Sequence, residues 1–523
     1  MRALVQMLGA DAAVASCIAD APKIISPAPT YPFLLALRAQ NKPLLVITSS
    51  SRGAEDLANE LRELHPNVFE FPAWETLPHE RLSPRSDTVA RRLATLSALQ
   101  SKELNNPIVV APIRAAIHKF IANLATQPLQ TLEIGGEVDL TSLVEHLTQL
   151  SYTRTDLVEK RGEFAVRGGI VDLFLPLSEH PIRIDFFGDE IEELSFFDVA
   201  SQRTTNPVVG KLSILPCREL LLTEAIRARA ESAKEKYPAA LEILDRIAQG
   251  IVTEGMESLI PILIDETETI FQRIPAGSEV IFIDDERIRM RTMDLLATNE
   301  EFFEAAWSHA AIGAGAPLPV KDATYLSWDE LGQEISRRTL TSRAFNPYGT
   351  DLDTEATFLD FSAIDPLRGD ADRAVAAMQE AVSQGFSIIF STAGQGMAER
   401  YAGIFRNADL PVVITPDLNA IPTKASIHIT QSSIAHGFSS LDSRILFMTE
   451  RDLTGSKASA KDGARMPSKR KQAVDPLELR AGDFVVHEQH GIGRYVEMVQ
   501  RTINGVTREY LVIEYAPAKR GQP

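Results

Sequence analysis

The sequence predicts an α/β protein with two smaller β-rich parts, and three observations support this fold class. Short apolar runs such as Leu44–Thr48 alternate with helical patterns such as 54–64, as in a parallel sheet covered by helices. Between residues 152 and 199, and again after residue 479, apolar residues instead recur with period two. The length of 523 residues allows three to four domains at roughly 150 residues each.

The first α/β domain is predicted in two parts, over residues 1–125 and 211–349. Its strands include Leu44–Thr48 and 108–111, and the same texture returns with Glu279–Ile283 after a helix-rich stretch. Because these runs are apolar throughout, we expect them to lie inside one parallel sheet.

The residues between these two parts, 126–210, are predicted to form an inserted β-rich module. Glycines punctuate its alternating runs, and glycine accepts the positive φ of tight hairpin turns. The runs and their turns are 164–167, Gly168–Gly169, 170–175, 182–187 and Gly188–Asp189.

Three further segments complete the predicted organisation: a second α/β domain over 350–453, a flexible basic linker over 454–475, and a small β domain over 476–523. We interpret the linker as solvated charge rather than a DNA-binding tail, because it lacks interleaved aromatic residues. In the last segment Asn504–Gly505 separates two β-prone runs, which is typical of a hairpin. The chain stops a few residues past a strand, so we expect it to be a fragment.

Charge and cysteine content narrow the functional classes. The formal net charge is -18, so the chain as a whole repels phosphate backbones, and any contact with nucleic acid must be local. Cys17 and Cys217 are isolated, and His487 and His490 are three apart in β-like sequence, so we predict no metal site. No run approaches the ~18 apolar residues of a membrane span, and we expect a cytoplasmic protein without membrane contact.

The sequence lacks the phosphate loop of a nucleotide-driven enzyme. No GxxxxGK[ST] run occurs, and the loop Ser26–Pro32 that follows the first strand contains three prolines, which cannot donate amides to phosphate. Asp284 and Asp285 end a strand as Mg²⁺-holding acids do. The alternative, an acidic helix start after a buried strand, is favoured by the missing loop.

Several blocks resemble, in family order, the N-terminal half of the bacterial transcription-repair coupling factors, the Mfd family. The first half of the chain also resembles the excision-repair subunit UvrB more distantly, and the last segment resembles CarD-type modules that bind RNA polymerase. The blocks are Phe71–Arg81, Phe164–Pro176, Arg183–Asp198, Ala435–Phe438 and Gly482–Tyr515.

The resemblance implies a degenerate RecA-like domain of UvrB type, interrupted by a module that binds UvrA. The UvrA contacts would then be Arg167, Arg183 and Phe187, and Asp284–Asp285 would be a nucleotide relic. Arg183 and Phe187 are four apart in one strand and should share a face. The alternative, that Phe187 is core and the arginines are only solvated, stays open from the sequence. With these contacts, Arg167→Ala or Arg183→Glu should abolish UvrA binding without lowering the melting temperature.

For the C-terminal part, the resemblance implies a CarD-like or Tudor-like domain that docks on the RNA polymerase β subunit by adding a strand. The candidate edge is Tyr495–Ile503, with Arg494, Tyr495 and Arg501 as contact residues. A strand buried within a complete barrel is the alternative.

Together these resemblances imply a non-catalytic, monomeric part of a factor for transcription-coupled nucleotide excision repair. ATP, Mg²⁺ and most DNA contacts would belong to motor domains that these residues do not contain, so no cofactor is expected here. The alternatives are a UvrB-type ATP-dependent helicase and a CarD-like transcription regulator. ATP turnover would favour the helicase.

Overall fold

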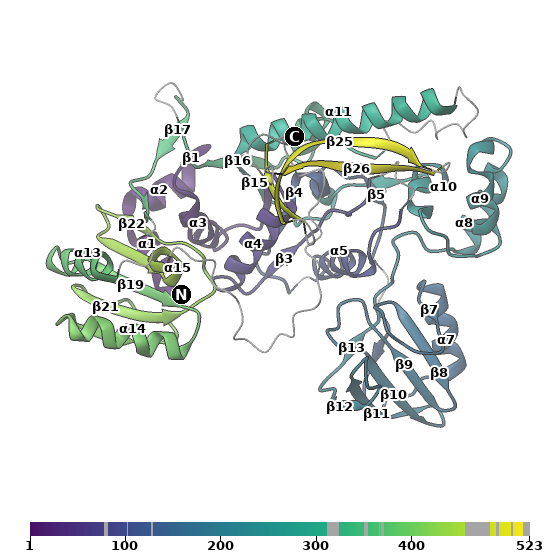
Figure 1. Ribbon diagram of the computed structural model, residues 1–523, viewed down its shortest axis with the longest axis horizontal. Helices are drawn as coiled ribbons and strands as arrows, with labels where there is room; N and C mark the ends of the chain where they lie inside the picture. The colour runs from purple at the N-terminus through teal and green to yellow at the C-terminus, as the bar shows by residue number, and fades with distance from the viewer. Residues whose placement is uncertain are drawn as a thin grey trace. The chain divides into compact units, whose positions relative to one another are not determined.

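The computed structural model (Figure 1) shows a mixed α/β protein with several sheets. It describes residues 1–77, 82–101, 103–126, 129–310, 324–349, 354–365, 367, 371–454, 482–487, 491–503 and 506–515. Met1–Gly463 form one compact unit and Ala464–Pro523 another. Residues 455–475 of the predicted linker, the predicted turn Asn504–Gly505 and His490 lie outside the described residues.

A seven-stranded parallel sheet has the order β17-β1-β16-β15-β2-β4-β3. Its inner strands β2 and β4 are buried at every residue, as their unbroken apolar runs predict. The strands are β1 (Lys23–Ile25), β2 (Leu44–Thr48), β3 (Val68–Glu70), β4 (Ile108–Pro112), β15 (Glu279–Ile283), β16 (Thr341–Asn346) and β17 (Ala356–Phe358).

Helices connect these strands, and the amphipathic ones among them bury one apolar stripe. In α4 the stripe is Ala54, Leu57, Ala58 and Leu61, and the Ser50 hydroxyl accepts a hydrogen bond from the Gly53 amide as a cap. The helices are α3 (Tyr31–Arg38), α4 (Ser51–Arg62), α5 (Ser86–Ala98), α6 (Ile113–Ala116), α11 (Asp285–Ala310) and α12 (Trp328–Arg337).

The inserted module is a six-stranded sheet with the order β12-β11-β10-β9-β8-β7, antiparallel except for the β7–β8 pair. Gly168 and Gly188 have φ of 63° and 65°, which the two hairpin turns require. The elements are β6 (Thr131–Leu132), α7 (Leu140–Gln149), β7 (Thr153–Arg154), β8 (Glu163–Arg167), β9 (Ile170–Leu173), β10 (Ile182–Phe187), β11 (Glu190–Phe197), β12 (Thr204–Pro207) and β13 (Leu212–Ser213), of which β6 and β13 pair separately.

A small helical part follows the module. Its helices pack around Leu244, Met256 and Leu259, which are almost fully buried. The elements are α8 (Glu224–Ala233), α9 (Leu241–Ala248) and α10 (Ile260–Leu263), with β14 (Thr267–Glu268) pairing to β5 (Phe120–Ile121).

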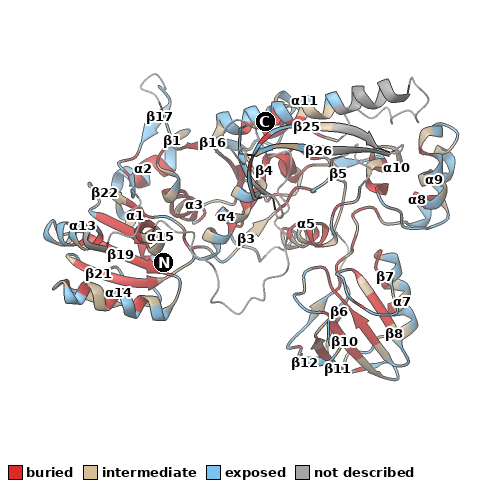
Figure 2. Cartoon of the chain, viewed as in Figure 1, coloured by how far each residue is buried: buried red, intermediate tan, exposed pale blue. Residues whose placement is uncertain are grey.

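A second, six-stranded sheet has the order β18-β22-β23-β19-β21-β20. Figure 2 shows its central strands β19 and β21 in the colour of buried residues. The elements are β18 (Ser362–Ala363), α13 (Ala371–Ser383), β19 (Ser387–Thr392), α14 (Gln395–Asn407), β20 (Val412–Ile414), β21 (Ser426–Gln431), β22 (Phe438–Ser440), β23 (Ile445–Thr449) and α15 (Glu450–Thr454).

The seven-stranded sheet and the second α/β sheet, which contains β19 and β21, share one apolar core. The ring of Phe33 from α3 lies 5.4 Å, between centroids, from both Phe438 and Phe447 of the second sheet. One buried cluster also holds Leu4 of the N-terminal helix α1 (Arg2–Ala10). Strand β17 lies in the range that the sequence assigned to the second domain, yet it pairs with β1 of the first sheet.

The N-terminal helices α1 and α2 (Ala12–Asp20) pack their apolar side chains into this shared core. Across the described residues, none of the individual helices has the length and apolar composition needed to cross a membrane. The pair α1 and α2, bent by 90°, reaches that threshold by length and composition alone.

The second unit contains a three-stranded antiparallel sheet, β24-β25-β26. The strands are β24 (Phe484–His487), β25 (Gly491–Ile503) and β26 (Val506–Tyr515). Strand β26 pairs with β25 from Gly493 to Ile503, whereas β24 pairs only with Gly491 to Arg494.

Candidate partner-binding face

The structure brings Arg167, Arg183 and Phe187 to one face of the module's sheet. Arg167 stands opposite Ile170, and Ile170 opposite Asp185. Because side chains alternate along a strand, Asp185 shares its face with Arg183 and Phe187. We call this side the polar face. The opposite face carries the module's apolar core, which includes Phe164, Val171, Leu173, Ile182 and Ile184.

Phe187 is the main exposed apolar group of the polar face. Its exposed fraction is 76%, and it lies beside the Gly188 turn, opposite Glu190. The alternative in which Phe187 is a core residue is therefore excluded. An aromatic ring left in water gains free energy when a partner covers it.

The side chain of Arg183 is bound by other groups of the same chain. Its Nε donates to Asp172 Oδ1 at 2.7 Å and its Nη2 donates to Oδ2 at 2.9 Å, while Nη1 donates to the Gln202 carbonyl at 3.3 Å. The guanidinium also lies 4.9 Å from the centroid of Phe197. Hydrogen bonding to Asp172 raises the pKa of Arg183 further above its ordinary value. Its two donors Nε and Nη2 are therefore occupied by a buried carboxylate of the chain itself.

Arg167 differs from Arg183 because its side chain is exposed. Its Nη2 donates a hydrogen bond to the Asp156 carbonyl at 2.6 Å. Asp185 lies on the same face, opposite Ile170, and burial together with Glu193 raises the pKa of its carboxyl group. The face thus offers an exposed ring, one exposed guanidinium and several carboxylates.

The segment Leu215–Glu219 joins the module to the first α/β domain. Leu215 packs with Val89 and Leu93 of α5, whereas Cys217 packs into the module's own core. We call this segment, together with the side chains that hold Arg218 and Glu219, the joint.

Glu219 forms a buried ion pair at the joint. Arg92 Nε donates to Glu219 Oε1 at 2.6 Å, and Trp74 Nε1 donates to the same oxygen at 3.0 Å. The side chains of Arg92 and Glu219 are 1% and 0% exposed. The Arg92 guanidinium lies 4.1 Å from the centroid of Phe71. Burial and Arg92 hold the pKa of the neighbouring His118 well below its ordinary range.

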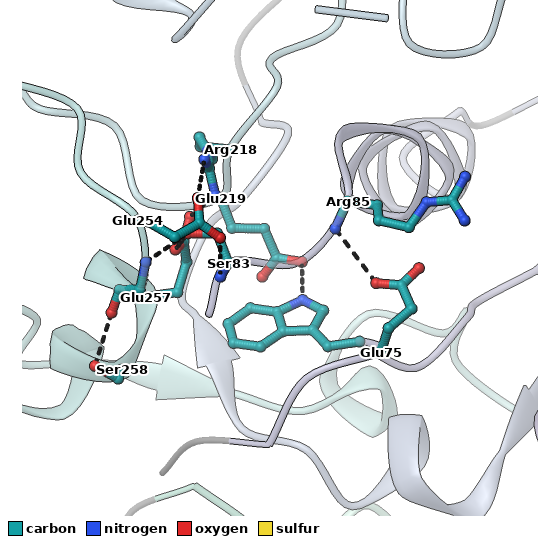
Figure 3. A network of polar contacts seen from close by, with 10 residues as sticks. Glu75, Ser83, Arg85, Arg218, Glu219, Glu254, Glu257 and Ser258 are labelled. Atoms are coloured by element: carbon teal, nitrogen blue, oxygen red, sulfur yellow. Dashed lines mark hydrogen bonds and ion pairs between the residues drawn. The ribbon is translucent and has the colours of Figure 1, made fainter. Parts of the chain in front are cut away.

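Arg218 ties the joint to the helical part (Figure 3). Its Nη1 lies 3.3 Å from Glu257 Oε1 and its Nη2 lies 3.4 Å from Glu254 Oε2. The Ser83 hydroxyl donates to Glu257 Oε2 at 2.6 Å. Burial raises the pKa of Glu257 despite the nearby Arg218.

Asp284 and Asp285 lie at the carboxyl end of β15, where α11 begins. Asp284 has φ of 65°, and its Oδ1 accepts from the Arg287 amide at 3.3 Å. Asp285 exchanges hydrogen bonds with the buried Asn346 side chain. In the proline-rich loop, the Thr30 hydroxyl donates to the Pro27 carbonyl at 2.7 Å. Within the described part of the chain, no group of three His, Cys, Asp or Glu side chains is placed to hold a metal ion.

The three candidate residues in β25 have different environments. Arg494 Nη2 donates to Glu514 Oε2 at 2.8 Å, and both side chains are exposed. Tyr495 is 7% exposed, and its backbone pairs with Asp483. Arg501 stands opposite Arg508 in the register with β26. From Val496 onwards, no described strand pairs with the other side of β25.

Comparisons with known proteins cover nearly the whole chain. The UvrB interaction domain model matches residues 131–220, and the CarD-like/TRCF RID domain model matches residues 479–520. The transcription-repair-coupling factor of Mycobacterium tuberculosis is 39% identical over 524 residues, which cover 96% of this chain and 42% of that protein. The chain matches the transcription-repair-coupling factor family. The resemblance predicted from the sequence is confirmed.

More distant transcription-repair-coupling factors match over the same extent. The Myxococcus xanthus protein is 29% identical over 526 residues, covering 92% of this chain and 42% of its own length. The Escherichia coli protein is 27% identical over 502 residues, covering 88% of this chain and 41% of its own length. The chain thus spans about two fifths of the length of these transcription-repair-coupling factors.

Asp172 and Glu219 are the residues that the sequence reasoning missed. Asp172 is the charged residue within the run 170–175, and a charge among five apolar residues was the available signal. Its partner could not be chosen without the register that places it opposite Arg183. Glu219 lies in no motif, and the sequence carries no comparable signal for it.

Proposed function

We propose that the polar face of the module binds UvrA, and that the three-stranded sheet docks on the β subunit of RNA polymerase. The chain would then recruit excision repair to stalled transcription complexes. One observation carries the first part: within the residues that match a UvrB interaction domain, Phe187 is 76% exposed on the same face as Arg167. An aromatic ring beside an arginine is the composition of an interface hot spot.

The UvrA proposal is tested by titrating the chain with UvrA and comparing Phe187→Ala with the parent. Truncating a hot-spot aromatic costs about 2 kcal/mol or more, which is a loss of roughly 30-fold in affinity. Leu177→Ala is the matched control, because Leu177 is 44% exposed in the β9–β10 connection, at the other end of β10. Equal affinities for the parent and Phe187→Ala would contradict the proposal.

The polymerase proposal is supported by the side of β25 from Val496 onwards, where no described strand is paired. Backbone amides and carbonyls along such an edge can accept an added strand. The full chain should retain the N-terminal region of the polymerase β subunit in a pull-down, and a chain lacking residues 479–523 should not. Undiminished UvrA binding by the shortened chain serves as the control. Retention of the β subunit by the shortened chain would contradict the proposal.

We further propose that the seven-stranded sheet is a degenerate RecA-like domain of UvrB type that does not hydrolyse ATP. The support is the proline-rich loop after β1, together with the use of Asp284 and Asp285 as caps and hydrogen-bond partners within the fold. ATP-driven translocation would reside in parts of the relatives that this chain does not span. Phosphate release by the purified chain should stay at background, and turnover would favour a UvrB-type helicase.

A further inference from the structure

We infer that the contact surface for UvrA continues from the polar face around the outer edge of β11, on to an apolar spot formed by Ile134 and Val209. This inference rests on the proposed function, because it adds contact residues to the same site. The exposed fractions are 56% for Ile134 and 93% for Val209.

Two neighbouring turns carry these side chains. The Gly135 amide donates to the Ile191 carbonyl at 2.8 Å, and the Val208 amide donates to the Leu194 carbonyl at 2.8 Å. Ile191 and Leu194 belong to one strand, β11, so both turns lie along the same edge of the sheet. The short strands next to the two turns, β6 and β13, also pair with each other, with Leu132 opposite Leu212.

The fold does not require apolar groups at these two positions. The Gly136 amide donates to the Glu133 carbonyl at 3.0 Å, and Gly135 has φ of 79°, so Ile134 occupies the second position of a tight turn. Turns favour Gly, Pro, Asn, Asp and Ser rather than β-branched residues. Residues just before them in the sequence fill the module's core instead: Leu132 lies two residues before Ile134, and Val208 directly precedes Val209.

The spot is continuous with the polar face through one row of residues. Glu137, three residues after Ile134, forms an isolated bridge with Glu190, and Glu190 stands opposite Phe187. Acidic groups therefore lie between the apolar side chains, and Lys211 pairs with Glu133 at 2.9 Å. The matching surface of UvrA should therefore carry apolar patches separated by cationic groups. Protein interfaces commonly combine apolar anchor residues with a polar rim in this way.

The experiment is a titration of UvrA with the full chain carrying Ile134→Ser and Val209→Ser together. We expect affinity to fall about tenfold, as for the loss of roughly 1.4 kcal/mol of apolar contact. The melting temperature should stay unchanged, because both side chains are exposed. Leu177→Ser and Leu241→Ser are the controls, with exposed fractions of 44% and 50%, and should bind as the parent does.

The outcomes separate this inference from the proposed function. If the double variant binds like the parent while Phe187→Ala binds weakly, the extended surface is wrong and the UvrA face stands. If neither variant changes the affinity, the UvrA face itself is wrong. If the double variant has a lowered melting temperature, hydrogen exchange of backbone amides in the unaltered chain is the second test. UvrA should then slow the exchange of residues 133–136 and 207–211. Unchanged exchange rates at these residues would overturn the inference.

Discussion

The polar face and the joint of the inserted module use arginine and aromatic side chains in opposite ways. At the joint, Arg92 is buried against Phe71 and Trp74, and Glu219 accepts its hydrogen bond. On the polar face, Phe187 is 76% exposed and Arg167 is exposed. Both regions therefore contain the same types of residue. At the joint, the chain itself supplies the carboxylate that pairs with the arginine and the side chains that bury it, whereas on the polar face it leaves Arg167 and Phe187 exposed.

Arg183 lies between these extremes. It is on the polar face, yet its guanidinium is bound by Asp172, whose side chain is 3% exposed. When two donors of a guanidinium bind a carboxylate of the same chain, the arginine mainly stabilises the fold. Only its remaining N–H groups can then contact a partner. The comparison predicts that removing a charge partner should lower the stability most at Glu219 of the joint, less at Arg183 and least at exposed groups.

The largest effect is expected for Glu219→Ala. Removing Glu219 leaves the Arg92 charge buried without its partner, which costs about 3–5 kcal/mol of unfolding free energy. Chemical denaturation followed by circular dichroism measures this loss. Lys211→Ala is the control, because its pair with Glu133 is exposed and should contribute about 0–1 kcal/mol. Equal losses for the two variants would contradict the contrast between joint and surface.

A smaller effect is expected for Arg183→Glu, which sets a second carboxylate against the buried Asp172. The loss of two charge-assisted hydrogen bonds should cost about 1–3 kcal/mol and lower the melting temperature. The sequence alone predicts that the variant keeps its melting temperature, and the difference arises from the ion pair with Asp172. The double variant Arg183→Gln and Asp172→Asn should recover most of the stability, because it leaves no unpaired buried charge. An unchanged melting temperature for Arg183→Glu would show that Asp172 is not held as described.

The smallest effect is a pH dependence at the joint. Burial raises the pKa of Glu257 above its ordinary value of 4.5, so its contribution is fully present below about pH 4.5 and is lost as the pH rises through the raised pKa. Glu257→Gln should therefore gain stability relative to the parent between pH 4.5 and 7. Denaturation at both pH values measures this difference, and a constant difference would contradict the assignment.

Much of the candidate face could be predicted from the sequence, because it depends on local order. The period-two runs and the glycines around 164–187 define hairpins, and strand alternation puts Arg183 and Phe187 on one side. Whether that side was exposed could not be predicted, since a half-buried strand has the same alternation whichever side faces the core. The pairing of Arg183 with Asp172 also needed the register between β9 and β10.

Local patterns in the chain are enough to predict the kinds of element and their order: apolar runs for parallel strands, alternating runs for the module, and prolines where a phosphate loop would lie. Three features could be known only once the chain was folded: Phe33 joins two sheets in one core, β17 completes the first sheet, and Glu219 pairs with Arg92. The difference comes from the distance along the chain over which each effect acts. Propensity and periodicity act over a few residues, whereas Arg92 and Glu219 are 127 residues apart, and packing alone brings such charges together.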